Sequence, residues 1–158
     1  MKKRVYFGSF DGPWWPDPRD IEEYFLAPPG REWSYKGGND TWGLEAEGLY
    51  DTEGLTPETG RVDVTLYMCG HPDHGVYLVY HKWDGRTHQK DEYSSKGDLR
   101  RLHEWAYSRQ GDPLPIGLFV PFPKAWFAVK EFIETDGKLP TSIEWVADKD
   151  IPASAFPR

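Results

Sequence analysis

The stretch that decides the fold is GLFVPFPKAWFAVKEFIETDGKLPTSIEWVAD, residues 117 to 148. Pro123 suits the first turn of a helix, because its ring fixes φ and its missing N–H would be unpaired there anyway. Gly137 can close the last turn in the left-handed conformation, and Pro140 prevents the helix from resuming. Spacings of three and four place one broad apolar stripe on this predicted helix. The stripe consists of Ala125, Trp126, Ala128, Val129, Phe132 and Ile133.

The residues that follow this helix alternate with the period of a strand. In the segment from Ser142 to Val146, Ile143 and Trp145 fall on one face and the residues between them on the other. The sequence therefore predicts a buried helix whose chain returns directly onto a sheet.

The middle of the chain predicts more of that sheet. Apolar and polar residues alternate over 62–68 and again over 76–83, and the polar segment 70–75 between them is typical of a hairpin turn. Asp84 and Gly85 supply a second tight turn, so residues 87–93 are predicted to form a third, more polar strand at the sheet edge. Three consecutive strands joined in this way form a meander.

The N-terminal segment predicts one more strand and a short helix. Val5 and Phe7 alternate in the predicted strand, and Phe10 is a further candidate near its end. Asp17 is a suitable helix cap and Pro18 a suitable first residue, and Pro28 to Gly30 end the helix. Its apolar stripe consists of Ile21, Tyr24 and Phe25.

Three segments have weaker patterns. Residues 31–60 are rich in glycine and acidic residues, and Leu44 and Ala46 indicate a strand there. Residues 96–110 fit either a helical stripe or a strand over 103–107, and residues 148–158 are predicted to be a terminal tail. Together these elements predict one α+β domain, residues 1–158, in which two main helices pack on a mostly antiparallel sheet.

Composition limits the functional classes. The chain has 158 residues, a net charge of −7 and a single cysteine, Cys69. An acidic protein is poorly suited to bind nucleic acid directly, because a phosphate backbone needs a basic field. The lone cysteine fits a reducing compartment, and no apolar stretch reaches the length of a signal peptide core or a membrane span. We therefore expect a cytoplasmic protein that binds neither nucleic acid nor membrane.

The last third of the chain resembles the Imm1 immunity proteins of bacterial polymorphic toxin systems. The shared pattern is a short apolar segment with proline, a helix with a Phe-rich end, then Gly, Pro and a strand with tryptophan. The matching residues are Leu118, Val120, Pro121, Ala125, Ala128, Val129, Phe132, Gly137, Pro140 and Trp145. The resemblance implies a bacterial cytoplasmic protein that inhibits a cognate toxin domain and has no catalytic residue or cofactor. It also favours a strand, after one helical turn, in residues 96–110.

The resemblance suggests a partner, because Imm1-like proteins are encoded beside toxins that often carry nucleic-acid deaminase domains. A deaminase that holds a polyanion is expected to have a basic active-site rim. Acidic residues could meet this rim, although a solvated acidic face is the simpler explanation of the same run. The predicted acidic contacts are Glu45, Glu47, Asp51, Glu53 and Glu58.

Aromatic and turn residues complete the predicted toxin-binding set. Tryptophan and tyrosine are frequent hot spots of protein interfaces, although Trp14 and Trp15 fit the core equally well. These further candidates are Trp14, Trp15, Asp73, His74, Trp83, Asp84 and Tyr93.

One enzymatic alternative stays open. Cys69, His71 and His74, with His81 on the next strand, could hold zinc or form a Cys–His hydrolase site. Against this, residues 70–75 also read as an ordinary polar turn, and the sequence has no paired-cysteine motif and no nucleophile elbow. We therefore expect no metal and no catalysis, with a small Cys/His hydrolase or metal-dependent enzyme as the alternative.

Overall fold

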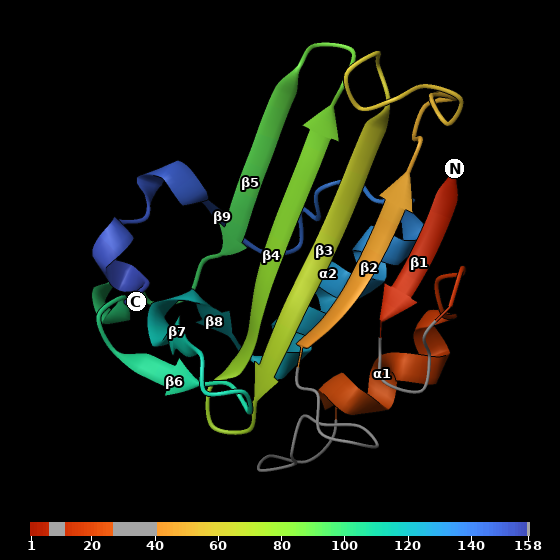
Figure 1. Cartoon of the computed structure of the whole chain (residues 1–158). Coiled ribbons are helices and arrows are strands. Elements are labelled where there is room, and N and C mark those ends of the chain that lie inside the picture. The colour runs from red at the N-terminus through yellow and green to blue at the C-terminus, as the bar shows by residue number, and fades with distance from the viewer. Residues whose placement is uncertain (7–11, 27–40, 158) are drawn as a thin grey trace.

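The computed structural model describes residues 1–6, 12–26 and 41–157. These residues form a seven-stranded sheet in the order β1-β2-β3-β4-β5-β9, with β8 paired to β4, and every pairing is antiparallel (Figure 1). Its strands are β1 (Lys2–Tyr6), β2 (Thr41–Glu47), β3 (Val62–His71), β4 (Gly75–Asp84), β5 (Gln89–Ser95), β8 (Phe119–Val120) and β9 (Trp145–Ala147). The predicted α+β class and the meander β3-β4-β5 are confirmed.

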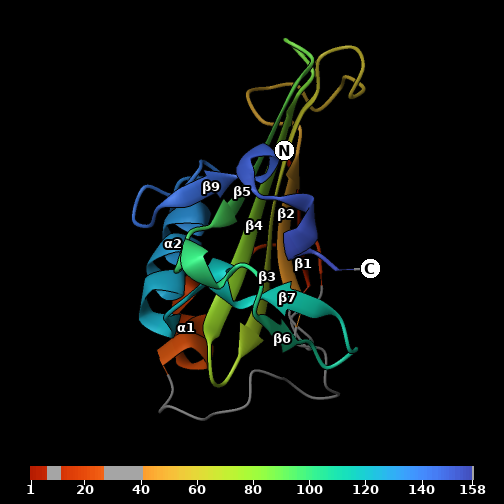
Figure 2. The ribbon, with the colours of Figure 1, turned by 90° about the vertical axis from the view of Figure 1, so that its left-hand side faces the viewer.

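Two helices, α1 (Pro18–Leu26) and α2 (Phe122–Glu134), cover one face of the sheet (Figure 2). The helix α2 buries Ala125, Trp126, Ala128, Val129 and Phe132 against it, so the predicted stripe is confirmed. Gly137 has a φ of 96° beyond the end of α2, as predicted. The helix begins at Phe122, directly before Pro123. The main core therefore lies between α1, α2 and the sheet.

The short helix α1 also follows its sequence signals. The Asp17 carboxylate accepts the backbone N–H of Arg19 at 2.9 Å, and α1 starts at Pro18. Ile21, Tyr24 and Phe25 are buried, as predicted. The predictions for Phe7, Phe10 and residues 28–30 lie outside the described residues.

A second apolar cluster packs on the opposite, open face of the sheet. It is built from the ribbon of β6 (Trp105–Tyr107) and β7 (Pro113–Pro115) and from short 3₁₀ turns around it. These turns are η2 (Leu99–Arg101), η3 (Ile116–Leu118), η4 (Asp148–Asp150) and η5 (Ala153–Ala155). The buried residues of this second cluster are Tyr77, Leu102, Ala106, Leu118, Phe119, Ile151 and Ala155. The strand favoured for residues 96–110 is β6, which follows the helical turn η2, so this prediction is confirmed. The segment predicted to be a terminal tail, from residue 148 onward, is in fact packed through Ile151 and Ala155.

The strand that returns from α2 is shorter than predicted. Glu131 of α2 accepts the backbone N–H groups of Thr141 at 2.6 Å and Ser142 at 3.0 Å, so these residues pair with the helix instead of the sheet. Pairing starts at Trp145, which lies opposite Ser95. The third strand of the meander, β5, was predicted to lie at the sheet edge. Because β9 pairs with Tyr93 to Ser95, only residues 89–92 of β5 lie at the edge.

Neither described helix has both the length and the apolar character needed to cross a lipid bilayer.

Candidate functional site

The sheet extends beyond the helices as an arm, which consists of residues 48–63 and 81–92 (Figure 2). Three contacts hold its loop against the ends of β4 and β5. The indole N–H of Trp83 donates to the Pro57 carbonyl at 2.8 Å, the backbone N–H of Gly85 donates to the Arg61 carbonyl at 3.0 Å, and His88 Nε2 lies 2.8 Å from the Glu58 carbonyl. A Cβ on Gly85 would lie only 2.5 Å from the Pro57 oxygen, so the close approach requires glycine. The arm is therefore an ordered structure.

Tyr50 and Asp51 at the arm loop adopt an unfavourable backbone conformation. Their φ angles are 58° and 60°, in the left-handed region that aspartate tolerates and tyrosine rarely adopts. The side chain of Tyr50 is 52% exposed, and its ring centroid lies 4.7 Å from the Arg86 guanidinium carbon and 5.6 Å from Lys82 Nζ. Strain that presents a large aromatic to solvent is typical of a functional surface. The sequence reasoning missed Tyr50, whose position between Gly48 and an acidic run is only a weak signal.

The acidic residues of the arm differ in their partners. Glu53 pairs with the Met1 ammonium, which lowers the pKa of its carboxyl. Asp84 pairs with Arg86 at 2.9 Å, and this contact lowers the pKa of Asp84 to about 2. Asp51 and Glu58 are exposed and have no ion-pair partner among the described residues. Asp91 of β5 is likewise exposed and has no ion pair among the described residues, so these three carboxylates are the unpaired acidic groups of the arm.

Glu45 and Glu47 lie on β2, on the open face of the sheet. Glu45 is half-buried and accepts a hydrogen bond from the Tyr67 hydroxyl; burial and this carboxylate both raise the pKa of Tyr67. Glu47 is exposed, with Arg61 Nη1 3.9 Å from its carboxylate. Arg61, directly after the run 40–60, thus reduces the acidic character of this face.

The predicted tryptophans have different surroundings. Trp14 is 50% exposed. Trp15 is half-buried: its indole N–H lies 3.0 Å from the Glu45 carbonyl and 3.2 Å from the Arg4 carbonyl, and its ring centroid is 5.0 Å from that of Phe132. These contacts explain Trp15 as part of the core.

The remaining predicted aromatic and turn residues are spread over the molecule. Tyr93 is half-buried on the helix side of the sheet, next to the Tyr80 ring at 6.5 Å. Asp73 and His74 lie in the β3–β4 turn, at the opposite end of the hairpin from the arm. Burial and the neighbouring His71 lower the pKa of His74. The predicted binding set therefore divides into an arm group and separate residues elsewhere.

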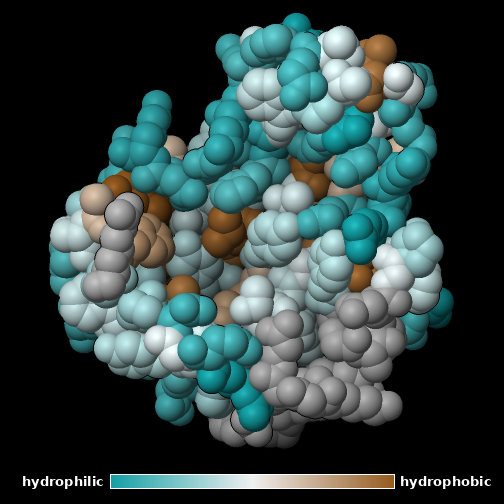
Figure 3. All heavy atoms as spheres, viewed as in Figure 1, coloured by the Kyte–Doolittle hydropathy of each residue, from teal (hydrophilic) through white to brown (hydrophobic). Residues whose placement is uncertain are grey.

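The open face is hollowed between the arm and the second cluster (Figure 3). One hollow of about 230 Å³ lies over β3 and β4. A second, of about 190 Å³, lies beside the β6–β7 ribbon, and Tyr67 lines both. Figure 3 shows hydrophobic side chains exposed in the middle of this face, below a mostly hydrophilic arm. This face offers a shallow, mixed surface to a partner.

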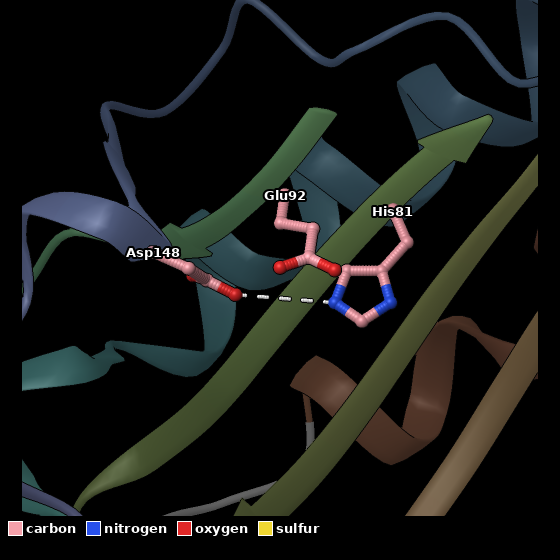
Figure 4. A group of neighbouring side chains, drawn as sticks. All are labelled: His81, Glu92 and Asp148. Carbon is pink, nitrogen blue, oxygen red and sulfur yellow. Dashed lines mark ion pairs between the residues drawn. The ribbon is translucent and has the colours of Figure 1, made fainter. Parts of the chain in front are cut away.

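The enzymatic alternative gains no geometric support from the described residues. Cys69 is buried, and the rings of His71 and His74 lie 4.8 Å apart. A different trio, His81, Glu92 and Asp148, brings its ligand atoms within 4.8 Å of one another (Figure 4). Among the described residues, this is the group of three or more His, Cys, Asp or Glu side chains with such a spacing. Only His81 belonged to the predicted set.

Comparison with protein-family models gave a match to Immunity protein Imm1 over residues 39–147, which covers β2 to β9 and the whole arm. Comparisons with curated proteins and with solved structures gave no match. The family match includes the helix α2 and the strand β9, on which the sequence resemblance rests, and extends it through the meander. The chain therefore belongs to the Imm1 family of immunity proteins.

Proposed function

We propose that this immunity protein binds a cognate toxin domain and covers its active site, without any catalysis of its own. We further propose that the toxin is a nucleic-acid deaminase. The family supports a toxin partner, and the deaminase is proposed because Imm1-like proteins are encoded beside toxins that often carry such a domain. The chain inhibits by occupying space that the substrate needs.

The observation that carries this proposal is the arm with its strained Tyr50–Asp51 pair. Folding alone does not require an exposed tyrosine in the left-handed region, and the arm extends past the helices that stabilise the rest of the sheet. A rigid, exposed aromatic beside charged groups is the usual composition of an interface hot spot. The arm is thus the proposed centre of the toxin-binding surface.

Charge gives the arm a role in the approach of the partner. At the loop, Asp51 and Glu58 present carboxylates that form no ion pair with any residue the structure describes. A deaminase groove that binds phosphates is basic, so these carboxylates accelerate encounter and then occupy positions that substrate phosphates would take. The hollow over β3 and β4 lies beside the arm and can receive side chains of the same partner, and the second hollow continues the open face toward the β6–β7 ribbon.

Co-expression with the toxin domain encoded in the neighbouring gene tests the function. We expect growth to be rescued, the two proteins to copurify, and deamination of a nucleic-acid substrate to stop at an equimolar ratio. The matched control is the toxin with its catalytic glutamate replaced, which should bind the immunity protein equally well. If the chain rescued growth but no complex formed, or the purified chain consumed a substrate alone, inhibition by occlusion would be wrong. If a complex formed with a toxin of other chemistry, only the deaminase assignment would fail.

A further inference from the structure

Three potential metal ligands converge on the open face, where the strands β4 and β5 meet the chain after β9 (Figure 4). His81 and Glu92 are directly opposite residues of β4 and β5. Asp148 starts η4, directly after Ala147, the last residue of β9. All three side chains are half-buried. Neither the predicted toxin-binding set nor the family match gives them a role.

The spacing of their ligand atoms suits one metal ion. His81 Nε2 lies 3.9 Å from Asp148 Oδ2, and the three ligand atoms lie within 4.8 Å of one another. Two ligands of a tetrahedral zinc, each at about 2.1 Å from the ion, are roughly 3.4 Å apart. Small side-chain rotations on this partly exposed surface therefore bring the three groups to coordinating distance.

The carboxylate of Asp148 is oriented by buried groups outside the cluster. Ser94 is fully buried, and its hydroxyl donates to Asp148 Oδ1 at 2.8 Å. The Tyr77 hydroxyl lies 3.3 Å from the same Ser94 oxygen and can donate to it. These bonds hold one oxygen of Asp148 and leave Oδ2, the oxygen that faces His81, for a ligand. Metal sites commonly fix their ligating carboxylates in this way.

One cation already contacts this cluster. Lys90 Nζ lies 2.6 Å from Glu92 Oε1, and this contact lowers the pKa of Glu92. Lys90 is exposed, with 64% of its side chain accessible, so it can leave at little cost. The carboxylates of Glu92 and Asp148 outnumber this one ammonium, which leaves negative charge for a divalent ion. Lys90 is therefore a competitor of the metal, and its removal is informative.

We propose that His81, Glu92 and Asp148 bind one divalent transition-metal ion of the zinc type. One imidazole nitrogen with two carboxylate oxygens is a donor set that zinc accepts, and three protein ligands leave a position for water. Because Asp148 leads into η4 and η5, the ion would link the C-terminal turns to the centre of the sheet. This inference is independent of the proposed toxin binding.

Calorimetric titration of the purified full chain with ZnCl₂ tests the site. We expect one equivalent to bind the wild type and to raise its unfolding temperature, whereas MgCl₂ does neither, because magnesium prefers a shell of oxygen ligands only. His81→Gln and Asp148→Asn should each weaken zinc binding at least about tenfold. Lys90→Met should strengthen it, because the competing ammonium is gone.

His71→Ala is the matched control, since His71 lies outside the proposed site and pairs with His74 in the β3–β4 turn region. It should leave the affinity for zinc unchanged. The proposal is overturned if wild type binds no zinc, if His71→Ala removes binding while His81→Gln retains it, or if Lys90→Met has no effect. Circular dichroism of each variant separates loss of the site from loss of the fold, and Asp148→Asn keeps the Ser94 hydrogen bond.

Discussion

Near its turn, the β3–β4 hairpin is covered on both faces, whereas at the other end the same two strands leave the helices and carry the arm. Around the turn, Met68 and Leu78 pack under the helices, and Tyr77 packs in the second cluster. In the arm, Tyr50 is exposed and strained, and Asp51 and Glu58 have no ion-pair partner among the described residues. The covered end explains why the chain folds. The exposed and strained Tyr50 of the arm is not explained by folding, so the arm is the better candidate for a functional surface.

The sharpest test of the covered end is Phe132→Ala. Phe132 is fully buried, with ring centroids of Trp15 at 5.0 Å and Tyr80 at 6.2 Å. We expect the free energy of unfolding to fall by about 3 to 5 kcal/mol in urea titrations. Phe127→Ala on the same helix is the control: Phe127 is 58% exposed, so its loss should cost less than about 0.5 kcal/mol. Equal losses for both would contradict the assigned core.

Charge reversal in the arm should affect association more than stability. We expect Asp51→Lys combined with Glu58→Lys to slow association with the toxin at least about tenfold at low salt, measured by stopped flow. Stability should fall by about 1 kcal/mol, because both side chains are exposed and only residue 51, with a φ of 60°, holds lysine in the left-handed region. Glu22→Lys with Glu144→Lys makes the same change in net charge away from the arm. If that pair slowed association equally, steering would depend on net charge and the arm would have no special part.

Tyr50→Asn should separate stability from binding. Asparagine tolerates the left-handed region, so relief of the strain at φ 58° should stabilise the protein by about 0.5 to 1 kcal/mol. The loss of the aromatic contact should at the same time accelerate dissociation from the toxin about tenfold. Surface plasmon resonance and thermal unfolding measure the two effects. A variant that is more stable and binds as tightly as wild type would remove Tyr50 from the interface.

The smallest effect is expected at Glu131, which joins α2 to the chain before β9. Burial raises the pKa of Glu131, but hydrogen bonds from Thr141 and Ser142 outweigh it and leave the pKa below its ordinary value of 4.5. A carboxyl with a lowered folded pKa stabilises above its unfolded pKa, and this stability is lost as the pH falls through the folded value. Glu131→Gln should therefore cost about 1 kcal/mol at pH 7, and the cost should shrink below pH 4.5. If the difference in unfolding free energy between wild type and Glu131→Gln did not change with pH in acid unfolding experiments, this role of the Glu131 carboxylate would be excluded.

Local signals account for what could be predicted from sequence. Asp17 and Pro18 mark the start of α1, and Gly137 the end of α2, because caps and glycine act within a few residues. The alternation of 62–68 and 76–83 predicts the hairpin for the same reason. The placement of Ile143 and Trp145 against the main core was also predictable, although their strand begins later.

What could not be predicted depends on contacts between distant segments. The pairing of β8 with β4 and the packing of Ile151 in the second cluster join parts of the chain with no shared local pattern. Likewise, Arg61 approaches Glu47, and Asp148 approaches His81, only after the sheet has formed. Sequence identified the acidic run, but its pairing with cations required the structure. The candidate site is therefore less predictable than the fold.

The hydrogen bonds that fix the arm loop end on the main-chain carbonyls of Pro57, Glu58 and Arg61. Main-chain carbonyls are present whatever side chain a residue carries. The loop can thus exchange its outward side chains during evolution while Trp83, Gly85 and His88 keep its path unchanged. A lineage of such inhibitors can in this way follow a diverging toxin by replacing a few surface residues, without having to acquire a new scaffold.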